Sequence, residues 1–429
     1  MDYDFPPLID STMSSATASL LSPLRNPLYR NIWLATLISN FGVWIQSVAA
    51  AWLMTSIASS VDFVAWVQAA TSLPPVLFTL IGGVLADRMD QRLVFLMAQS
   101  IVLFVALLLA VCQYASLITP WLLLALTFAL DSGSALRYPA YQTTIGEILP
   151  REQLPNALVL SSIGWNIGRV VGPAIGGAII ALYGVPTAFA ANALCNIYII
   201  FVLLRWRQSA KISKPAAKTS MLTEISHGLG YVHRTPLIRA VMLCCFVFCL
   251  FAAGLWSLLP LVVKQLVGGN ASTYGAALGA IGVGALIGAA VIGTARRRLG
   301  QRPLFAVATA AFTLSTLALA VVQSVPLLLV ALTLGGIGWM LAMSTFNVVV
   351  QMAAADGFKG RAVSVYYVAL FGGIALGSWL WGHMAEYFGI RSSLYAATAG
   401  LTLSLIFYRP TSRLGNLLED RSLPPGKST

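Results

Sequence analysis

Three ionisable residues lie deep inside long apolar segments of this 429-residue chain: Asp131, Arg137 and Arg169. A charged group in the hydrocarbon core of a membrane is costly, so such residues usually serve an ion or substrate path. Asp131 is about 13 residues into its segment, roughly 20 Å along a helix, which predicts a position near the middle of a bilayer. A carboxylate at that depth can take up and release a proton.

The two arginines leave two interpretations of Asp131 open. In the first, Asp131 is the protonatable group of a proton-coupled site, and an entering substrate disturbs its pairing with an arginine. In the second, a static Asp131–Arg169 or Asp131–Arg137 pair only holds two helices together. Asn166 lies three residues before Arg169, so these two side chains share one helix face.

Other polar and aromatic residues within apolar segments are candidates for a substrate path, because polar groups facing lipid would lack hydrogen-bond partners. The candidates in the first segment are Asn40, Trp44 and Gln46, and those near residue 350 are Asn347 and Gln351. We expect the first half of the chain to handle ions. We expect the second half to hold the apolar or aromatic body of a substrate on a soft surface formed by Trp339, Met340, Met343, Phe346 and Asn347. The alternative is that these side chains mostly pack between helices.

Membrane-spanning helices must position these residues. Hydrophobic residues make up 58% of the chain and charged residues 9%, against about 25% charged residues in a soluble domain. Apolar runs near 20 residues recur, and each can cross ~30 Å of hydrocarbon as a helix. We predict an all-α polytopic membrane protein with twelve transmembrane helices, at 32–56, 62–86, 93–115, 118–142, 156–182, 187–206, 238–263, 272–295, 303–323, 326–351, 361–387 and 391–408.

The predicted domains are a cytoplasmic N-terminal tail (1–26), a six-helix half (27–206), a cytoplasmic linker (207–235), a second six-helix half (236–408) and a cytoplasmic C-terminal tail (409–429). We expect a short amphipathic helix in the linker, at about 220–233. Residues 1–24 contain three aspartates and no basic residue, which is not the pattern of a signal peptide.

The distribution of positive charge predicts the orientation. Of the 26 Lys and Arg residues, 22 fall in the tails and in the loops on the same side, two (Arg137 and Arg169) fall within helices, and two (Lys264 and Arg391) fall opposite. The positive-inside rule then places both tails in the cytoplasm. The net charge of +12 therefore indicates contact with anionic lipid and not with nucleic acid.

The two halves of the chain repeat at offsets of 205 to 210 residues. Pro27–Arg30 recurs as Pro236–Arg239, Gly83–Arg92 as Gly293–Arg302, and the glycines at 168, 172, 177 and 184 as glycines at 373, 377, 382 and 389. Transporters with such parallel halves place the substrate site between them, near the membrane midplane. At these offsets Asp131 corresponds to Met340 and Arg169 to Ile374, so deep charge is confined to the first half.

The chain contains no motif typical of an enzyme, a metal site or a cofactor site. No Walker A, H-E-x-x-H or G-x-S-x-G pattern occurs. The five cysteines lie in apolar runs with spacings that fit neither disulfides nor zinc. We therefore expect no enzymatic activity, no metal and no cofactor.

The loop after the second predicted helix reads GVLADRMDQR from Gly83 to Arg92, which resembles the G-x-L-a-D-r-x-G-r-[RK] motif of the major facilitator superfamily. Asp90 and Gln91 depart from the usual Gly and Arg. The resemblance implies a cytoplasmic gate formed by Gly83, Asp87, Arg88 and Arg92, in which Asp87 meets the N-terminal end of the helix at 361–387. For Arg88 and Arg92 the alternative is that they are ordinary positive-inside residues with no role in a gate.

A glycine-rich stretch in the fifth predicted helix contains Gly168, Gly172, Pro173, Gly176 and Gly177, and it resembles a motif of exporters in that superfamily. Gly168, Gly172 and Gly176 form a stripe of small residues suited to a tight helix crossing, and Pro173 can bend the helix. The alternative is a tight crossing with no bearing on the direction of transport. Three further features resemble the arabinose-efflux and enterobactin-exporter-like branch: Asp131 early in the fourth predicted helix, the segment EILPRE from Glu147 to Glu152, and Asn166 with Arg169 before Gly172-Pro173.

Two further expectations concern helix ends. In the second copy of the gate motif Arg297 stands in place of Asp87, and we expect it to pair with Glu147 or Glu152. We expect Asp62 to cap the second helix at the outer face, and His383 and Glu386 to lie near that face.

The expected function is that of a bacterial inner-membrane secondary transporter with both termini in the cytoplasm. It would act as a monomer and export a small amphiphilic molecule, such as a drug or siderophore, in exchange for protons. The alternatives are uptake or facilitated diffusion of a sugar or metabolite, and a non-transporting membrane receptor or scaffold.

Overall fold

The structure, a computed structural model, describes the backbone of residues 20–88, 90–206, 230, 234–355 and 359–421. It describes the side chains of these residues except for 79–88, 301–302, 359–361 and 406–421. This part of the chain is built from helices and contains no strand. The predicted linker helix at 220–233 lies outside the described residues except for residue 230, as do residues 1–19 of the predicted N-terminal tail and 422–429 of the predicted C-terminal tail.

Within the described residues, twelve long helices confirm the predicted all-α membrane fold. The first six are α1 (Pro27–Ile57), α2 (Val61–Arg88), α3 (Gln91–Tyr114), α4 (Pro120–Ile148), α5 (Leu154–Tyr183) and α6 (Val185–Arg205). The second six are α8 (Pro236–Leu261), α9 (Ala271–Leu299), α10 (Gln301–Val321), α11 (Val325–Ala353), α12 (Lys359–Phe388) and α13 (Ile390–Arg421). The helices extend beyond most predicted spans by a few residues, and α13 continues to Arg421 instead of ending at 408.

Ten of the helices in the described part are long and apolar enough to cross a membrane. The two outside this set are α4 and α13. In α4 the hydropathy is lowered by Asp131 and Arg137 together with several polar residues.

Local sequence explains where the helices begin and turn. The side-chain oxygen of Asn26 accepts hydrogen bonds from the backbone of Leu28 and Tyr29, at 3.0 and 3.2 Å, and so caps α1. Gly184, Gly300 and Gly389 are the single-residue connections after α5, α9 and α12, with φ of 82°, 74° and 87°. Glycine adopts these positive φ values without the steric cost that a side chain would bring, so each connection reverses the chain within one residue.

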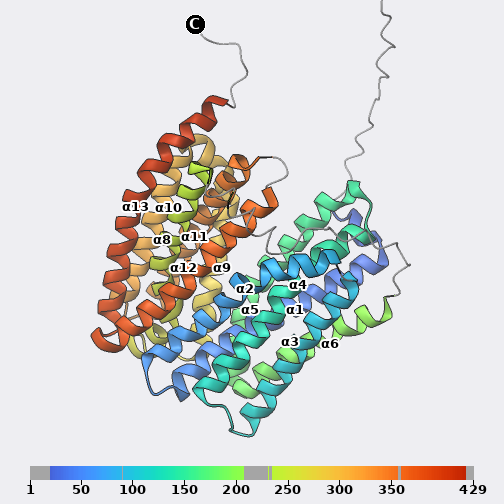
Figure 1. Ribbon diagram of the computed structural model, residues 1–429. Helices are drawn as coiled ribbons and strands as arrows, with labels where there is room; N and C mark the ends of the chain where they lie inside the picture. The colour runs from blue at the N-terminus through green and yellow to red at the C-terminus, as the bar shows by residue number, and fades with distance from the viewer. Residues whose placement is uncertain (1–19, 89, 207–229, 231–233, 356–358, 422–429) are drawn as a thin grey trace, which may run out of the picture.

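The helices form two bundles, which we call the N half (α1–α6) and the C half (α8–α13) (Figure 1). We call the end at which α1 begins and α13 ends the tail end, and the opposite end the far end. The halves lean together toward the far end and diverge toward the tail end in Figure 1. The main packing between them joins α2 to α12 and α5 to α9.

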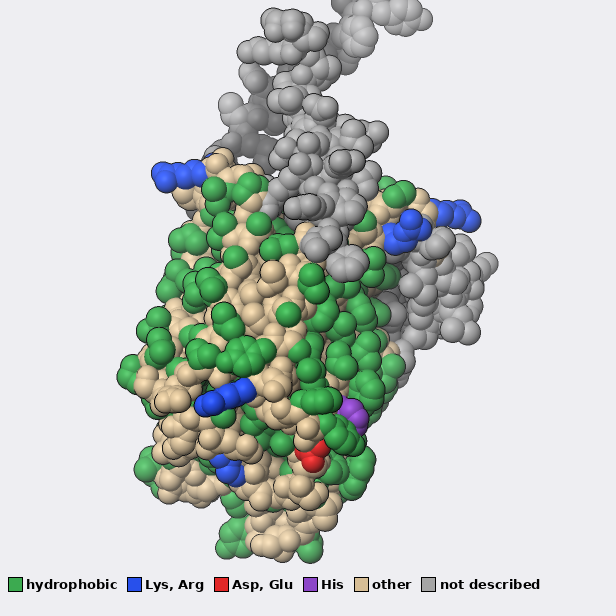
Figure 2. All heavy atoms as spheres, turned by 90° about the vertical axis from the view of Figure 1, so that its left-hand side faces the viewer, with side chains coloured by type: hydrophobic (Ala, Val, Ile, Leu, Met, Phe, Trp, Pro, Cys, Tyr) green, Lys and Arg blue, Asp and Glu red, His purple; other side chains and the backbone are tan. Residues whose placement is uncertain are grey.

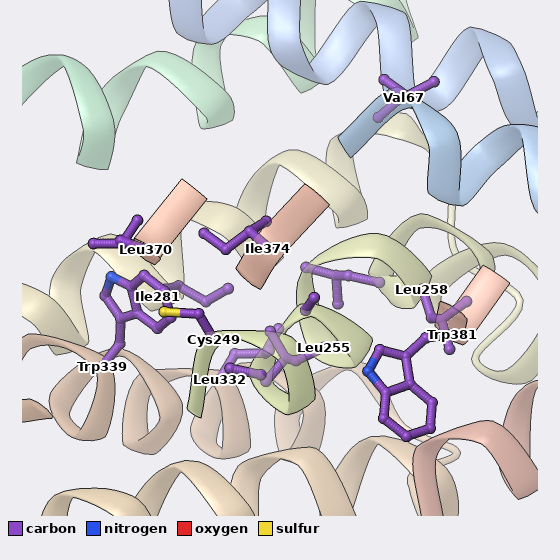
Figure 3. Packing of buried hydrophobic residues seen from close by; sticks show 14 of the residues in the cluster. Val67, Cys249, Leu255, Leu258, Ile281, Leu332, Trp339, Leu370, Ile374 and Trp381 are labelled. Atoms are coloured by element: carbon purple, nitrogen blue, oxygen red, sulfur yellow. The ribbon is translucent and has the colours of Figure 1, made fainter. Parts of the chain in front are cut away.

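The outer face of the C half is suited to lipid. Hydrophobic side chains are spread over the full height of the face in Figure 2, and charged side chains are few among those drawn in colour. The interior of the C half is equally apolar. Figure 3 shows Leu370 and Ile374 of α12 facing Trp339 of α11 and Cys249 of α8 within one cluster of buried side chains.

Candidate functional site

The predicted glycine stripe brings α5 directly against α1. A Cβ added to Gly168 would lie 3.1 Å from the Asn40 Cβ, and one added to Gly172 would lie 2.6 Å from the Trp44 Cβ. A Cβ on Gly176 would lie 3.0 Å from the Ile45 Cα. Because larger residues would not fit, the stripe allows the close approach that positions Asn40 and Trp44 beside α5.

The next glycine of the motif faces the other half. A Cβ on Gly177 would lie 2.6 Å from the backbone oxygen of Ala271 in α9, and a Cβ on Gly275 of α9 would lie closer still to the backbone oxygen of Pro173. The exporter-type motif therefore forms two contacts at once, with α1 inside the N half and with α9 across the interface.

Arg169 lies on the side of α5 between these two contact surfaces. Gly168 and Gly172 face α1, whereas Val170 packs against Gly282 of α9. Ile167 and Val171, each 41% exposed, cover the opposite side of α5 and face lipid. Arg169 therefore points toward the interior between the halves, where it is half-buried.

Two tryptophans lie on the same part of the α1–α5 contact. The ring centroids of Trp44 and Trp165 are 5.9 Å apart, and Trp165 is one helical turn before Arg169. Asn166, the other neighbour on this face, donates a hydrogen bond of 2.8 Å to the backbone oxygen of Ser162 on its own helix.

Asp131 is half-buried in α4 and has neither a hydrogen bond nor an ion pair within 4 Å among the described residues. Its electrostatic neighbour is Arg137, farther along the same helix. Asp131 thus has Arg137 and not Arg169 as its charged neighbour. Neither of the two static ion pairs considered from the sequence is formed among the described residues.

Arg137 is held by a buried hydrogen-bond network. Its guanidinium donates to the Ser39 hydroxyl at 2.8 Å, and Ser39 donates to the side-chain oxygen of Asn196 at 2.7 Å. The same Asn196 oxygen accepts from the Gln99 amide. These four residues come from α4, α1, α6 and α3, and all are at least 93% buried, so the network ties Arg137 to three neighbouring helices.

The network continues along α6 and back to α1. The Asn196 amide donates to the backbone and side-chain oxygens of Asn192, at 2.7 and 2.8 Å, and the Asn192 amide donates to Gln46 at 3.3 Å. We call Ser39, Gln46, Gln99, Asn192 and Asn196 the amide network. Gln46, a candidate for the substrate path, therefore packs inside the N half instead of lining the interface between halves.

Sequence reasoning missed Gln99, Asn192 and Asn196. The available signal was the spacing of Asn192 and Asn196, four residues apart in an otherwise apolar span, since buried amides in a membrane require partners.

The C half differs from the expected substrate surface. Phe346 is 1% exposed and Trp339 9% exposed, and both belong to an aromatic cluster around Phe248 in the core of the C half. For these two side chains the structure agrees with the alternative of helix packing, because they pack against aromatic neighbours. Asn347 is half-buried and accepts a hydrogen bond from Gln351 at the tail end of α11.

The gate motif is partly visible. The Asp90 carboxylate accepts from the backbone N–H groups of Arg92 and Leu93, at 2.8 and 3.2 Å, so it caps α3 and explains the departure from the usual glycine. The Arg92 guanidinium donates to the backbone oxygens of Leu203 and Leu204 at 2.8 and 3.0 Å, where it stabilises the C-terminal end of α6. Of Gly83, Asp87 and Arg88 the structure describes the backbone, as part of α2, and not the side chains of Asp87 and Arg88.

At the far end, two charged residues of the C half bind the turn between α1 and α2. The Lys264 ammonium donates to the backbone oxygen of Thr55 at 2.6 Å, in the last turn of α1. The Glu386 carboxylate accepts from the backbone N–H of Val61, the first residue of α2, at 2.5 Å. Each charge lies at the helix end of opposite polarity, which stabilises the contact. We call Lys264 and Glu386 the far-end clamp.

Two side chains extend this contact. The His383 Nδ1 lies 3.3 Å from a carboxylate oxygen of Asp62, in the first turn of α2. Asp62 and Glu386 thus both lie at the start of α2, where we expected Asp62 alone as a cap.

The tail end lacks the pair that we expected for Arg297. Its guanidinium donates to Thr294 of its own helix at 3.3 Å, and the described residues form no Arg297–Glu147 or Arg297–Glu152 pair. The reason is the path of α9, which packs on α5 as far as Gly282 and then on α11, where a Cβ on Gly288 would lie 3.0 Å from the Met340 Cβ. The two halves are therefore joined at the far end and separated near Arg297.

Comparison with known proteins agrees with this architecture. The chain is 27% identical over 407 residues to an uncharacterised MFS-type transporter of Bacillus subtilis, covering 89% of this chain and 94% of that protein. It is 24% identical to the staphyloferrin A transporter of Staphylococcus aureus (88% and 95% covered) and 27% identical to the multidrug efflux pump Tap of Mycolicibacterium fortuitum (88% and 94% covered).

A solved structure supports the fold. A bacterial homologue of the human lysosomal transporter Spinster superposes with a TM-score of 0.73 at 15% identity, covering 94% of this chain and 99% of that one. The family model described as "Transmembrane secretion effector" (MFS_3) matches residues 18–420. The chain therefore belongs to the MFS_3 family, in the efflux branch of the major facilitator superfamily, and is a membrane transporter and not an enzyme.

Proposed function

We propose that this transporter exports a small amphiphilic molecule from a bacterial cell in exchange for protons, and that Asp131 carries the proton. In this proposal the tail end faces the cytoplasm and the far end faces outward, in accordance with the distribution of Lys and Arg. The protein works as a monomer in the inner membrane, with lipid as its surroundings.

The observation that carries the proposal is the state of Asp131. It is the carboxylate in the middle of the described spans, it remains half-exposed, and no side chain neutralises it by an ion pair. A carboxylate fixed in a static pair would have its charge permanently balanced. An unpaired carboxylate at membrane depth needs either a proton or a cationic partner that comes and goes.

Arg137 provides a positive charge near this carboxylate, and the position of that charge is fixed. Because Arg137 is bound through Ser39 to the amide network, its guanidinium does not follow changes at Asp131. Protonation of Asp131 therefore changes the net charge of the interior by one unit without rearranging the core of the N half. In this proposal, protonation changes the equilibrium between the two arrangements of the halves and not the packing within the N half.

The contacts between the halves fit the loading step of an exporter. The far-end clamp is closed and the halves diverge toward the tail end (Figure 1). In this conformation a molecule from the cytoplasm would enter and Asp131 would lose its proton to the cytoplasm. After the far end opens, the molecule leaves and Asp131 accepts a proton from outside.

The names of two relatives suggest which compounds to test first. One is named as a staphyloferrin A transporter and another as a multidrug efflux pump. We therefore propose siderophores and drug-like amphiphiles as the first compounds to test.

The test uses everted membrane vesicles with a dye that reports the proton gradient. Each compound is added in turn to vesicles with the wild type, with Asp131→Asn, and with Glu152→Gln as a matched control, since Glu152 is exposed outside the long helices. We expect a compound to discharge the gradient in the wild type and in Glu152→Gln but not in Asp131→Asn.

An equal response of wild type and Asp131→Asn would refute the role of Asp131. Accumulation of a compound in right-side-out vesicles, driven by an imposed gradient of that compound alone, would instead favour uptake or facilitated diffusion.

A further inference from the structure

Arg169 is a cation without a counter-charge. Among the described residues its guanidinium has neither a hydrogen bond nor an ion pair, although it points into the interior between the halves and away from the lipid-facing side of α5. Charged residues within spans are costly and are found paired or in a path that ligands use. Arg137, the other deep arginine, differs because it is bound to Ser39.

The C half supplies no partner across the interface. The middle stretches of α8, α9, α11 and α12 contain no acidic or basic residue. Ile374, which corresponds to Arg169 in the repeat, lies in the apolar cluster with Trp339 and Leu370 (Figure 3). With two arginines and one aspartate, the deep interior is positive whether Asp131 is protonated or ionised.

A second observation on α1 points to the same ligand chemistry. The indole Nε1 of Trp44 is buried and has no hydrogen-bond acceptor among the side chains and backbone that the structure describes. Trp44 contacts Trp165 and packs against Gly172, which lie one turn to either side of Arg169 on α5. One unpaired cation and one unpaired N–H donor therefore occupy the same part of the α1–α5 contact, beside a pair of aromatic rings.

We infer that Arg169, Trp44 and Trp165 form a subsite for an organic anion, in which a carboxylate-like group binds Arg169 and an aromatic or flat apolar body packs on the two tryptophans. A guanidinium binds a carboxylate through two parallel hydrogen bonds, and indole rings stack on planar apolar groups. This inference rests on the proposed export function and specifies its cargo. Export of an anion is also favoured by a membrane potential that is negative inside.

The test measures binding to the purified full-length protein in lipid nanodiscs at pH 7, with no proton gradient. The probes are 2-naphthoate, 2-naphthamide and 2-naphthamidine, which share one shape and differ in charge. Isothermal titration calorimetry gives the Kd of each probe, with empty nanodiscs as the baseline for partitioning into lipid.

We expect 2-naphthoate to bind the wild type more tightly than the other two probes. Arg169→Gln should weaken its binding by about 10- to 100-fold, as for the loss of a charge-assisted hydrogen bond, and should leave 2-naphthamide unaffected. Arg169→Lys should retain part of the preference. Arg205→Gln is the matched control, because Arg205 is exposed at the tail end of α6, over the Phe201 ring.

The inference is overturned if the wild type has no preference for 2-naphthoate, or if Arg169→Gln binds it as tightly as the wild type. Elution of Arg169→Lys and Arg169→Gln as the same monodisperse species shows that a lost preference does not reflect misfolding. Because no proton gradient is present, failure of this test leaves proton-coupled export standing, and failure of the Asp131 experiment leaves the anion site standing.

Discussion

The far-end clamp should control how often the transporter opens outward. Lys264 and Glu386 bind the α1–α2 turn from the other half, so removal of both charges by Lys264→Met with Glu386→Gln weakens the closed far end without changing the core of either half. Loss of these contacts affects the closed far end selectively, because the two halves must separate there when it opens.

The structure sets the size of the effect. A charge at the helix end of opposite polarity contributes about 0.3–1 kcal/mol when exposed and up to about 2 kcal/mol when partly buried. Glu386 is exposed and Lys264 is half-buried with three oxygen acceptors, so together they contribute about 1–3 kcal/mol. The population open at the far end should therefore rise by about 5- to 150-fold.

Cysteine modification can report even a rare open state. Val67 of α2 is 3% exposed and belongs to the buried cluster that spans both halves. A Val67→Cys reporter in right-side-out vesicles should react with a membrane-impermeant maleimide only when the far end opens. The rate is followed by mass spectrometry on the peptide that contains position 67, and it should rise in proportion to the open population.

The control is Arg391→Gln, which removes an exposed charge at the same end of the C half without touching the turn. A rate in the double variant within twofold of the wild type would refute the reasoning, because it would show that the two charges do not hold the far end closed.

Three further predictions concern stability. Asn196→Leu should lower the free energy of unfolding by about 2–5 kcal/mol, because the buried donors of Ser39 and Gln99 lose their acceptor. Denaturant titration in detergent tests this, and an unchanged midpoint would contradict it. Gly172→Ala should cost about 1–3 kcal/mol through overlap with Trp44, whereas Gly146→Ala, with no atom within 4 Å of the added Cβ, should not destabilise the protein. Equal thermal midpoints for these two variants would count against the glycine-stripe argument. Asp90→Ala should cost about 0.5–2 kcal/mol by removing the cap of α3, and hydrogen exchange at the start of that helix should accelerate.

Features that depend on one helix or one repeat were predictable from the sequence. The spans follow from apolar runs, and the close packing of Gly168, Gly172 and Gly176 follows from their spacing of four residues. The role of Asp90 was predictable in principle but was not predicted. Its residue type and its place just before a helix are typical of an N-cap.

Features that depend on how helices meet were not predictable in the same way. Gln99 and Asn196 come from spans far apart in sequence, and their meeting depends on the packing of the whole N half. The clamp depends on the register between the two halves, so the only signal from Lys264 was its predicted place opposite the side that holds most Lys and Arg residues. The sequence could not decide the role of Phe346, because an aromatic side chain within an apolar span fits a core and a binding surface equally well.

The contact between α5 and α9 has a mechanical consequence. At Gly177 and Gly275 the two backbones touch directly, with no side chains interlocked between them. Rolling one helix over the other at this point requires no side chain to change rotamer. This crossing should therefore add little to the energy barrier for relative motion of the two halves. Resistance to this motion then comes from the side chains that bind across the halves at the far end, Lys264 at Thr55 and Glu386 at Val61.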